Sequence, residues 1–224
     1  MSFKSLSIVS AVLLALTGAA QAQNRFANGG FEDAQATLPS NNGPVAAPDA
    51  TKAQGWIPAA QGYDRSSDAH TGSWSALVHQ LNMDNSGVML QNSKATGGMP
   101  NLVAGETLKL SFWSKADVAD SLAFYTIGYS LRFLNDNGNI LFNTGFVDFR
   151  NQINNNTWSQ IMGGPVVVPV GATAAFLEFS AAGGARLAAY KIDDVALVPE
   201  PGTYALLLAG LAVVGVMAKR RRAA

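Results

Sequence analysis

Few residues in this chain are capable of nucleophilic or acid–base chemistry. The chain has two histidines, His70 and His79, and no cysteine, which leaves little material for a histidine relay or a zinc site and none for thiol chemistry. The stretch Gly72–Ser75 lacks the spacing of a nucleophile elbow. Asp193 and Asp194 are neighbours in an expected strand, where successive side chains point to opposite faces, so we do not expect them to share a face. These residues together predict a protein that is not an enzyme.

Composition limits the class of protein further. The 224 residues are 48% apolar and 13% charged, which suits one ordinary domain with tails and argues against disorder along the whole chain. The chain has 15 basic and 15 acidic residues, but Lys4 and Lys219–Arg222 lie at its ends, so the region between Asn24 and Val198 is mildly acidic. Without a basic patch in that region, we expect no nucleic-acid binding.

The first 22 residues have the pattern of a secretory signal peptide. Lys4 supplies the positive start, Ile8–Ala20 is largely apolar, and Ala20-Gln21-Ala22 forms a small-residue cleavage site. We expect export by the general secretory route and cleavage before Gln23. An uncleaved anchor or a buried helix is the alternative.

The last 26 residues, 199–224, form a second distinct segment. Pro199 and Pro201 disfavour helix, the 15 residues 204–218 carry no charge, and Lys219–Arg222 form a basic cluster. As a helix, the apolar run spans roughly 22 Å, short of a membrane core of about 30 Å. We expect a transmembrane helix whose arginines snorkel and stay on the cytoplasmic side. A buried C-terminal helix and a permanent anchor are the alternatives.

This C-terminal order resembles the PEP-CTERM protein-sorting signal. Its elements are Pro199, Glu200 and Pro201, then the apolar run, then the cluster with Arg220, Arg221 and Arg222. The resemblance implies a transient stay in the inner membrane and processing by an exosortase near Pro-Glu-Pro. It also implies delivery to the cell surface or extracellular polysaccharide matrix of a Gram-negative bacterium.

The region between the two ends, residues 23–198, reads as one all-β domain. Thr107–Lys115 alternates apolar and polar residues, and so does Tyr125–Phe133. Asn135–Gly138 predicts a tight turn into Ile140–Asn143. Further short apolar runs are Val166–Val170, Ala175–Ser180 and Tyr190–Val198. Without long helical periodicity, these runs predict an antiparallel β-sandwich, with helices only in the signal and sorting segments.

The succession of short motifs in this domain resembles the galactose-binding-like jelly roll, particularly carbohydrate-binding modules of the type called CBM4/9. The motifs are Asn28–Glu32, Gly55-Trp56, Ala69–Leu77, Leu102–Lys115, Thr157–Ser159, Val168–Leu177 and Ile192–Val195. The resemblance implies a structural calcium ion that joins the first strand to the last. Its ligands would be the carboxylates of Glu32 and Asp193 with carbonyls near Gly30 and His70, a donor set that calcium accepts. The alternative is that both carboxylates are surface groups beside turns.

Sugar binding in such modules relies on exposed aromatic faces with polar neighbours. Trp113 alternates outward beside Lys109 and Ser111 and is the best candidate for stacking on a sugar ring. Arg132 and Gln91 would assist it if their strands line the same face. We expect the other aromatic candidates to pack in the core: Trp56, Tyr63, Trp74, Tyr125, Tyr129 and Trp158.

The first functional interpretation is an exported, surface-sorted, non-catalytic protein associated with extracellular polysaccharide of the biofilm matrix and binding carbohydrate. A structural matrix or adhesion protein without a sugar site is the alternative, and a glycan hydrolase is a more distant one.

Overall fold

The computed structural model describes residues 24–36, 49–59, 62–83, 86–92 and 102–200. Asn24–Val198 forms one compact unit. The expected signal helix, the cleavage site and nearly all of the sorting segment lie outside the described residues. Within the described ranges, no helix has the length and apolarity of a membrane span.

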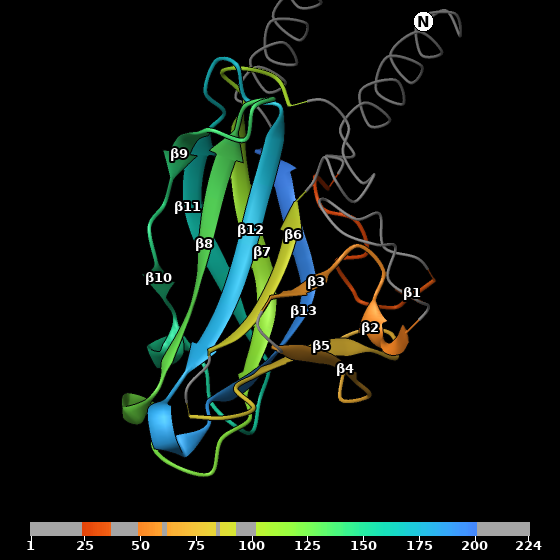
Figure 1. Cartoon of the computed structure of the whole chain (residues 1–224), viewed down its shortest axis with the longest axis vertical. Coiled ribbons are helices and arrows are strands. Elements are labelled where there is room, and N and C mark those ends of the chain that lie inside the picture. The colour runs from red at the N-terminus through yellow and green to blue at the C-terminus, as the bar shows by residue number, and fades with distance from the viewer. Residues whose placement is uncertain (1–23, 37–48, 60–61, 84–85, 93–101, 201–224) are drawn as a thin grey trace, which may run out of the picture. The chain divides into compact units, whose positions relative to one another are not determined.

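Two antiparallel sheets form a sandwich (Figure 1). The first has the order β10 (Val147–Asp148), β8 (Thr126–Leu134), β12 (Ala174–Ala182), β6 (Gly87–Asn92) and β3 (Ile57–Ala59), with β9 (Ile140–Asn143) paired to β8. The second has the order β11 (Ser159–Val167), β7 (Thr107–Ala116), β13 (Ala189–Pro199), β5 (Ser75–His79) and β4 (Tyr63–Ser66). The late strands β12 and β13 lie between earlier ones, as in a jelly roll.

Smaller elements lie around the sandwich. They are the pair β1 (Ala34–Gln35) and β2 (Asp49–Ala53) and the 3-10 turns η1 (Leu122–Phe124), η2 (Arg150–Gln152) and η3 (Gly184–Arg186). The predicted all-β sandwich is therefore confirmed. One predicted strand is wrong in extent: β11 ends at Val167, and Val168–Val170 belong to the connection that follows, where Pro169 cannot donate a ladder hydrogen bond.

The period of two along each strand explains the core. In β7, Leu108, Leu110 and Phe112 are buried and their neighbours are partly exposed. The Phe112 ring meets Phe149 and Phe179 edge-on, with centroids 5.2 and 5.0 Å apart. These contacts join residues of both sheets, so the aromatic core fixes how the sheets pack.

Candidate functional site

The loop before β5 is tied to the last strand by two consecutive carboxylates. Asp193 Oδ2 accepts hydrogen bonds from the backbone N–H groups of His70 (2.8 Å) and Thr71 (3.1 Å). The Thr71 hydroxyl donates to Asp194 Oδ1 at 2.6 Å, and His70 Nδ1 lies 2.7 Å from Asp194 Oδ2. Both carboxylates therefore bind the same loop through hydrogen bonds.

The prediction that these two carboxylates cannot share a face is wrong. Asp194 has φ of 51°, in the left-handed region, which breaks the alternation of β13. A Cβ atom placed on Gly30 would lie 3.9 Å from Asp193 Oδ1 and 3.9 Å from Asp194 Oδ1. The two side chains thus face the same small space beside Gly30.

Glu32 binds the other end of this loop. Its Oε1 accepts hydrogen bonds from the backbone N–H groups of Ser73 (2.9 Å) and Trp74 (3.0 Å). A Cβ atom on Gly72 would stand 2.2 Å from that oxygen, and Gly72 has φ of 64°. A side chain here would strain the backbone and would push the Glu32 carboxylate away from the N–H groups of Ser73 and Trp74. Glu32 near the start of the domain and Asp193 near its end thus hold one segment.

The carboxylates of Glu32 and Asp193 beside Gly30 are the kinds of oxygen donor that calcium accepts. The Asp193 side chain is fully buried, and burial raises its pKa to about 6 against the lowering effect of its hydrogen bonds from Thr71, Asp194 and His70. Carboxylate oxygens and a glycine-lined space suit a hard cation. However, no three His, Cys, Asp or Glu side chains in the described parts of the chain are grouped as a metal site. Main-chain oxygens and water would have to complete the shell.

Trp113 on β7 lies directly against this loop. The His70 ring stacks on Trp113 with centroids 3.8 Å apart and an interplanar angle of 14°. The Trp158 ring meets His70 edge-on at 6.0 Å, and Lys115 Nζ lies 5.2 Å from the centre of Trp158. Trp113 and Trp158 are half-buried. We call His70, Trp113 and Trp158 the aromatic cluster.

A charged network borders the aromatic cluster. Asp68 accepts hydrogen bonds from Lys115 (2.8 Å) and Lys191 (2.9 Å), and Lys191 also pairs with Asp117 at 3.1 Å. The hydrogen bond from Lys115 holds the pKa of Asp68 below its usual value, with Lys191 adding to the effect and burial opposing it. Because both lysines are largely covered, their stems pack against the sheet and only their ends reach the carboxylates.

Arg132 and Gln91 do not join Trp113, because they lie in the other sheet. Arg132 contacts Ser130 Oγ (3.1 Å) and Glu178 Oε2 (3.3 Å). Gln91 is buried and bonds both backbone polar groups of Ala27, a structural role that the sequence does not reveal.

The remaining aromatic candidates differ in burial. Four are buried as predicted: Trp56, Tyr63, Tyr125 and Tyr129. Trp74 and Trp158 are half-buried instead, because their rings are covered by Arg65 (4.2 Å to the ring centre) and Lys115 rather than by the core. For these two, the expected core position is wrong.

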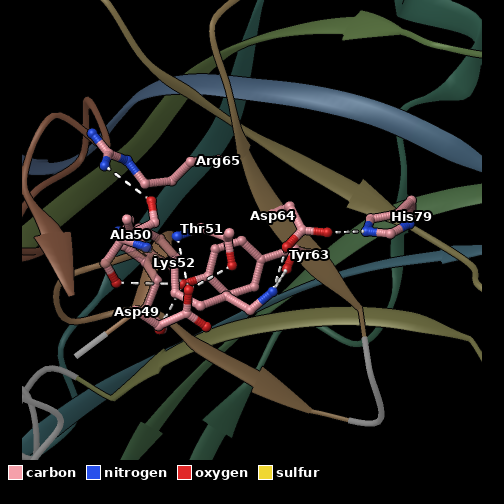
Figure 2. Close-up of polar contacts among 10 residues, drawn as sticks. Asp49, Ala50, Thr51, Lys52, Tyr63, Asp64, Arg65 and His79 are labelled. Carbon is pink, nitrogen blue, oxygen red and sulfur yellow. Dashed lines mark hydrogen bonds and ion pairs between the residues drawn. The ribbon is translucent and has the colours of Figure 1, made fainter. Parts of the chain in front are cut away.

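A second polar group lies at β4 and β5 (Figure 2). Asp64 contacts Lys52 Nζ at 2.5 Å through one oxygen and His79 Nε2 at 2.9 Å through the other. These residues line a depression of about 360 Å³ together with Pro58, Tyr63 and Leu81. The hydrogen bonds from Lys52 and His79 hold the pKa of Asp64 below its usual value, although burial, the largest single influence, acts in the opposite direction. No local sequence pattern marks this group, because its members come from separate strands.

Comparison with known families bears on the C-terminal segment. Residues 197–222 match the family described as the PEP-CTERM protein-sorting motif. The chain carries a PEP-CTERM motif. The motif implies a secreted protein with a C-terminal sorting signal that an exosortase processes. No curated protein sequence matches the chain.

Comparison with solved structures bears on the sandwich. The enzymatically active domain of tailspike protein 4 from bacteriophage CBA120 is similar with a TM-score of 0.53 and 17% identity, over 79% of this chain and 21% of that one. The CBM22-1 xylan-binding domain of Paenibacillus barcinonensis Xyn10C is similar with a TM-score of 0.45 and 14% identity, over 65% of this chain and 86% of that one. TmCBM61 in complex with β-1,4-galactotriose is similar with a TM-score of 0.44 and 17% identity, over 80% of this chain and 99% of that one. The chain thus spans about a fifth of the tailspike chain, and the likeness concerns the fold.

Proposed function

We propose that the PEP-CTERM protein is a non-catalytic carbohydrate-binding protein of the cell surface and its polysaccharide matrix. In this proposal the N-terminal segment is a cleaved signal peptide, the apolar tail is a transient anchor in the inner membrane, and the sandwich is the working part. The observation that carries the proposal is the stacked pair of His70 and Trp113 on the outer face of β7.

The aromatic cluster offers part of what sugar recognition requires, because His70 covers one face of the Trp113 indole and a sugar would meet the exposed remainder of the cluster. Stacking fixes the Trp113 ring before any ligand arrives, so little side-chain entropy remains to be lost on binding. Gln160 pairs with Trp113 across the β7–β11 ladder and is exposed, and Ser111 and Lys115 flank Trp113 on the same face of β7. Aromatic rings can pack against the apolar C–H face of a sugar, and amide, hydroxyl and ammonium groups beside them can bond its hydroxyls.

The carboxylates of the sandwich support a non-catalytic role. A glycosidase needs two carboxyl groups free to meet the scissile bond. Here Asp68 and Asp64 are held by ion pairs, Glu32 and Asp193 accept backbone N–H groups, and Glu178 pairs with Arg132. Using any of these as an acid or a base would break a contact that supports the fold.

Calcium enters the proposal as a structural ion. Glu32 and Asp193 would supply carboxylate oxygens, with carbonyls near Gly30 and His70. When bound, the ion would supply positive charge to a buried carboxylate. The loop that carries His70, and through it the aromatic cluster, would then be held more firmly.

Retardation of the mature protein in native gels that contain dissolved polysaccharides tests the proposal. Trp113→Ala is expected to abolish retardation, whereas Phe124→Ala, which removes an exposed aromatic ring on η1, is expected to preserve it. Absence of retardation with every glycan would favour the structural or adhesive alternative. Release of reducing sugar would favour a hydrolase.

A further inference from the structure

The edges of the two sheets border a second, open cavity that the aromatic cluster does not use. It measures about 290 Å³ and lies between β10 and β11, the last strands of their sheets. Figure 1 shows these two strands along the same side of the sandwich. Leu110, Leu131, Val147 and Val166 form apolar walls, and no charged residue lines the cavity.

A bulge in β11 keeps this cavity open. The register between β11 and β7 shifts between Met162 and Pro165, where Gly163 and Gly164 lie. A Cβ atom on Gly163 would stand 3.0 Å from Tyr129 Oη and 3.3 Å from Leu110 Cβ. A Cβ atom on Gly164 would meet nothing within 4 Å. The missing side chain at Gly163 therefore leaves room beside the Tyr129 hydroxyl.

No hydrogen bond joins the Tyr129 hydroxyl to another described residue, and its oxygen keeps some exposure to the cavity although the residue as a whole is only 5% exposed. Three other buried tyrosines contrast with it, because each hydroxyl meets backbone carbonyl oxygens: Tyr63, Tyr125 and Tyr190. A tyrosine hydroxyl without a protein partner is free to donate to a molecule in the cavity. Burial raises the pKa of Tyr129, so its hydroxyl stays protonated and can donate.

We propose that this cavity binds an acetyl substituent of a sugar, with the acetyl carbonyl oxygen accepting a hydrogen bond from Tyr129 Oη. The methyl group packs against Leu110, Leu131 and Val166. This inference rests on the proposed carbohydrate-binding function and assigns a second contact to it.

The chemistry of the walls selects this group over others. A sugar face with several hydroxyls would press some of them against the apolar walls without partners, at a cost for each. A carboxylate would enter without a cation to pair with, because the lining is uncharged. An acetyl group needs one donor and an apolar surface, and the cavity offers both.

Saturation-transfer NMR on the mature protein tests the proposal with sugars that differ in one substituent. The probes are the methyl β-glycosides of glucose, of N-acetylglucosamine and of 6-O-acetylglucose. The two acetylated probes are expected to show their strongest saturation at the acetyl methyl protons, and the glucoside, which has no acetyl group, is expected to show weaker saturation of its ring protons than the acetylated probes do. The comparison between the amide and the ester identifies which acetyl group fits.

Variants locate the binding. Gly163→Ala and Tyr129→Phe are expected to weaken binding about tenfold, the equivalent of one hydrogen bond. Met162→Ala is the matched control, because Met162 lies on the same strand, is exposed and does not line the cavity, and it is expected to bind as the unmodified protein does. Melting temperatures establish that each variant is folded.

Three outcomes would overturn the proposal. The first is equal signals from all three probes, and the second is no signal from any probe. The third is unchanged binding by folded Gly163→Ala and Tyr129→Phe. Its failure is separable from failure of the proposed function, since retardation by polysaccharide and its loss in Trp113→Ala are measured independently. Acetyl binding is expected to survive Trp113→Ala, and its loss there would place the acetyl group at the aromatic cluster instead.

Discussion

The His70 imidazole lies flat on the Trp113 indole at 3.8 Å, and its Nδ1 atom meets Asp194 Oδ2 at 2.7 Å. One side chain thus connects Asp194 of the last strand to the candidate sugar-stacking residue. This connection makes the geometry of the loop before β5 relevant to binding.

Replacing His70 tests that connection. His70→Ala removes the stack, which is worth about 0.5–1.5 kcal/mol for aromatic pairs, and polysaccharide affinity is expected to fall about twofold to tenfold. His79→Ala is the matched control, because His79 contacts Asp64 away from Trp113. Equal retardation of both variants in polysaccharide gels would show that the stack does not organise the binding surface.

Gly72 should be intolerant of any side chain. A Cβ atom there meets Glu32 Oε1 at 2.2 Å, and φ is 64°, so we expect Gly72→Ala to lower the free energy of unfolding by about 2–4 kcal/mol. Gly105 also has positive φ, of 84°, but has no atoms within 4 Å of the added position. Gly105→Ala is therefore expected to cost only about 1–2 kcal/mol. Urea unfolding measures both, and similar losses would mean that the loop relaxes away from Glu32.

The Asp68 network should give the sandwich an acid-sensitive contribution. Hydrogen bonds from Lys115 and Lys191 lower the folded-state pKa of Asp68, so the unfolded chain binds the proton more readily. The contribution is present above the unfolded value of about 3.9 and is lost as pH falls through the folded value. We expect the stability difference between the unmodified protein and Asp68→Asn to be constant near neutral pH and to shrink below pH 4. Thermal melts from pH 7 to pH 3 measure it, and a difference that persists throughout would contradict this account.

Calcium, if it binds as proposed, should raise the melting temperature. At a hundredfold excess over its dissociation constant an ion adds about 2.7 kcal/mol, or roughly 5–10 °C for a domain of this size. Chelation is expected to reverse the rise, and Asp193→Asn to eliminate it. Asp148→Asn is the control, because Asp148 contacts Arg150 in a different part of the sandwich. An unmodified protein that melts at the same temperature with and without chelator would remove the ion from the proposal.

Once the protein is exported, its release from the inner membrane should depend on the C-terminal motif. Replacing Glu200 with Ala, or deleting Lys219–Arg222, is expected to leave unprocessed protein in the inner membrane, because the exosortase signal or its membrane stop is lost. Cell fractionation and the size of the protein measure this. Surface delivery equal to that of the unmodified protein, from either variant, would contradict the expected role of the segment.

Local patterns predicted the strands well where side chains alternate cleanly. The expected Thr107–Lys115 and Tyr125–Phe133 correspond to β7 and β8, since a period of two reports directly which face is buried. The same rule failed at Asp193 and Asp194, because a left-handed residue interrupts the period and nothing in the sequence marks it. Trp74 and Trp158 were misplaced for a related reason: cations from other strands cover their rings.

The sequence by itself determined the PEP-CTERM motif and the all-β class, because a linear motif and a two-residue period are properties of neighbouring residues. Only the tertiary structure decided which side chains meet. It placed Arg132 and Trp113 in different sheets, stacked His70 on Trp113, and left the Tyr129 hydroxyl facing a cavity beside Gly163. These relationships join residues far apart in the chain, and strand order and packing, which local composition does not encode, establish them.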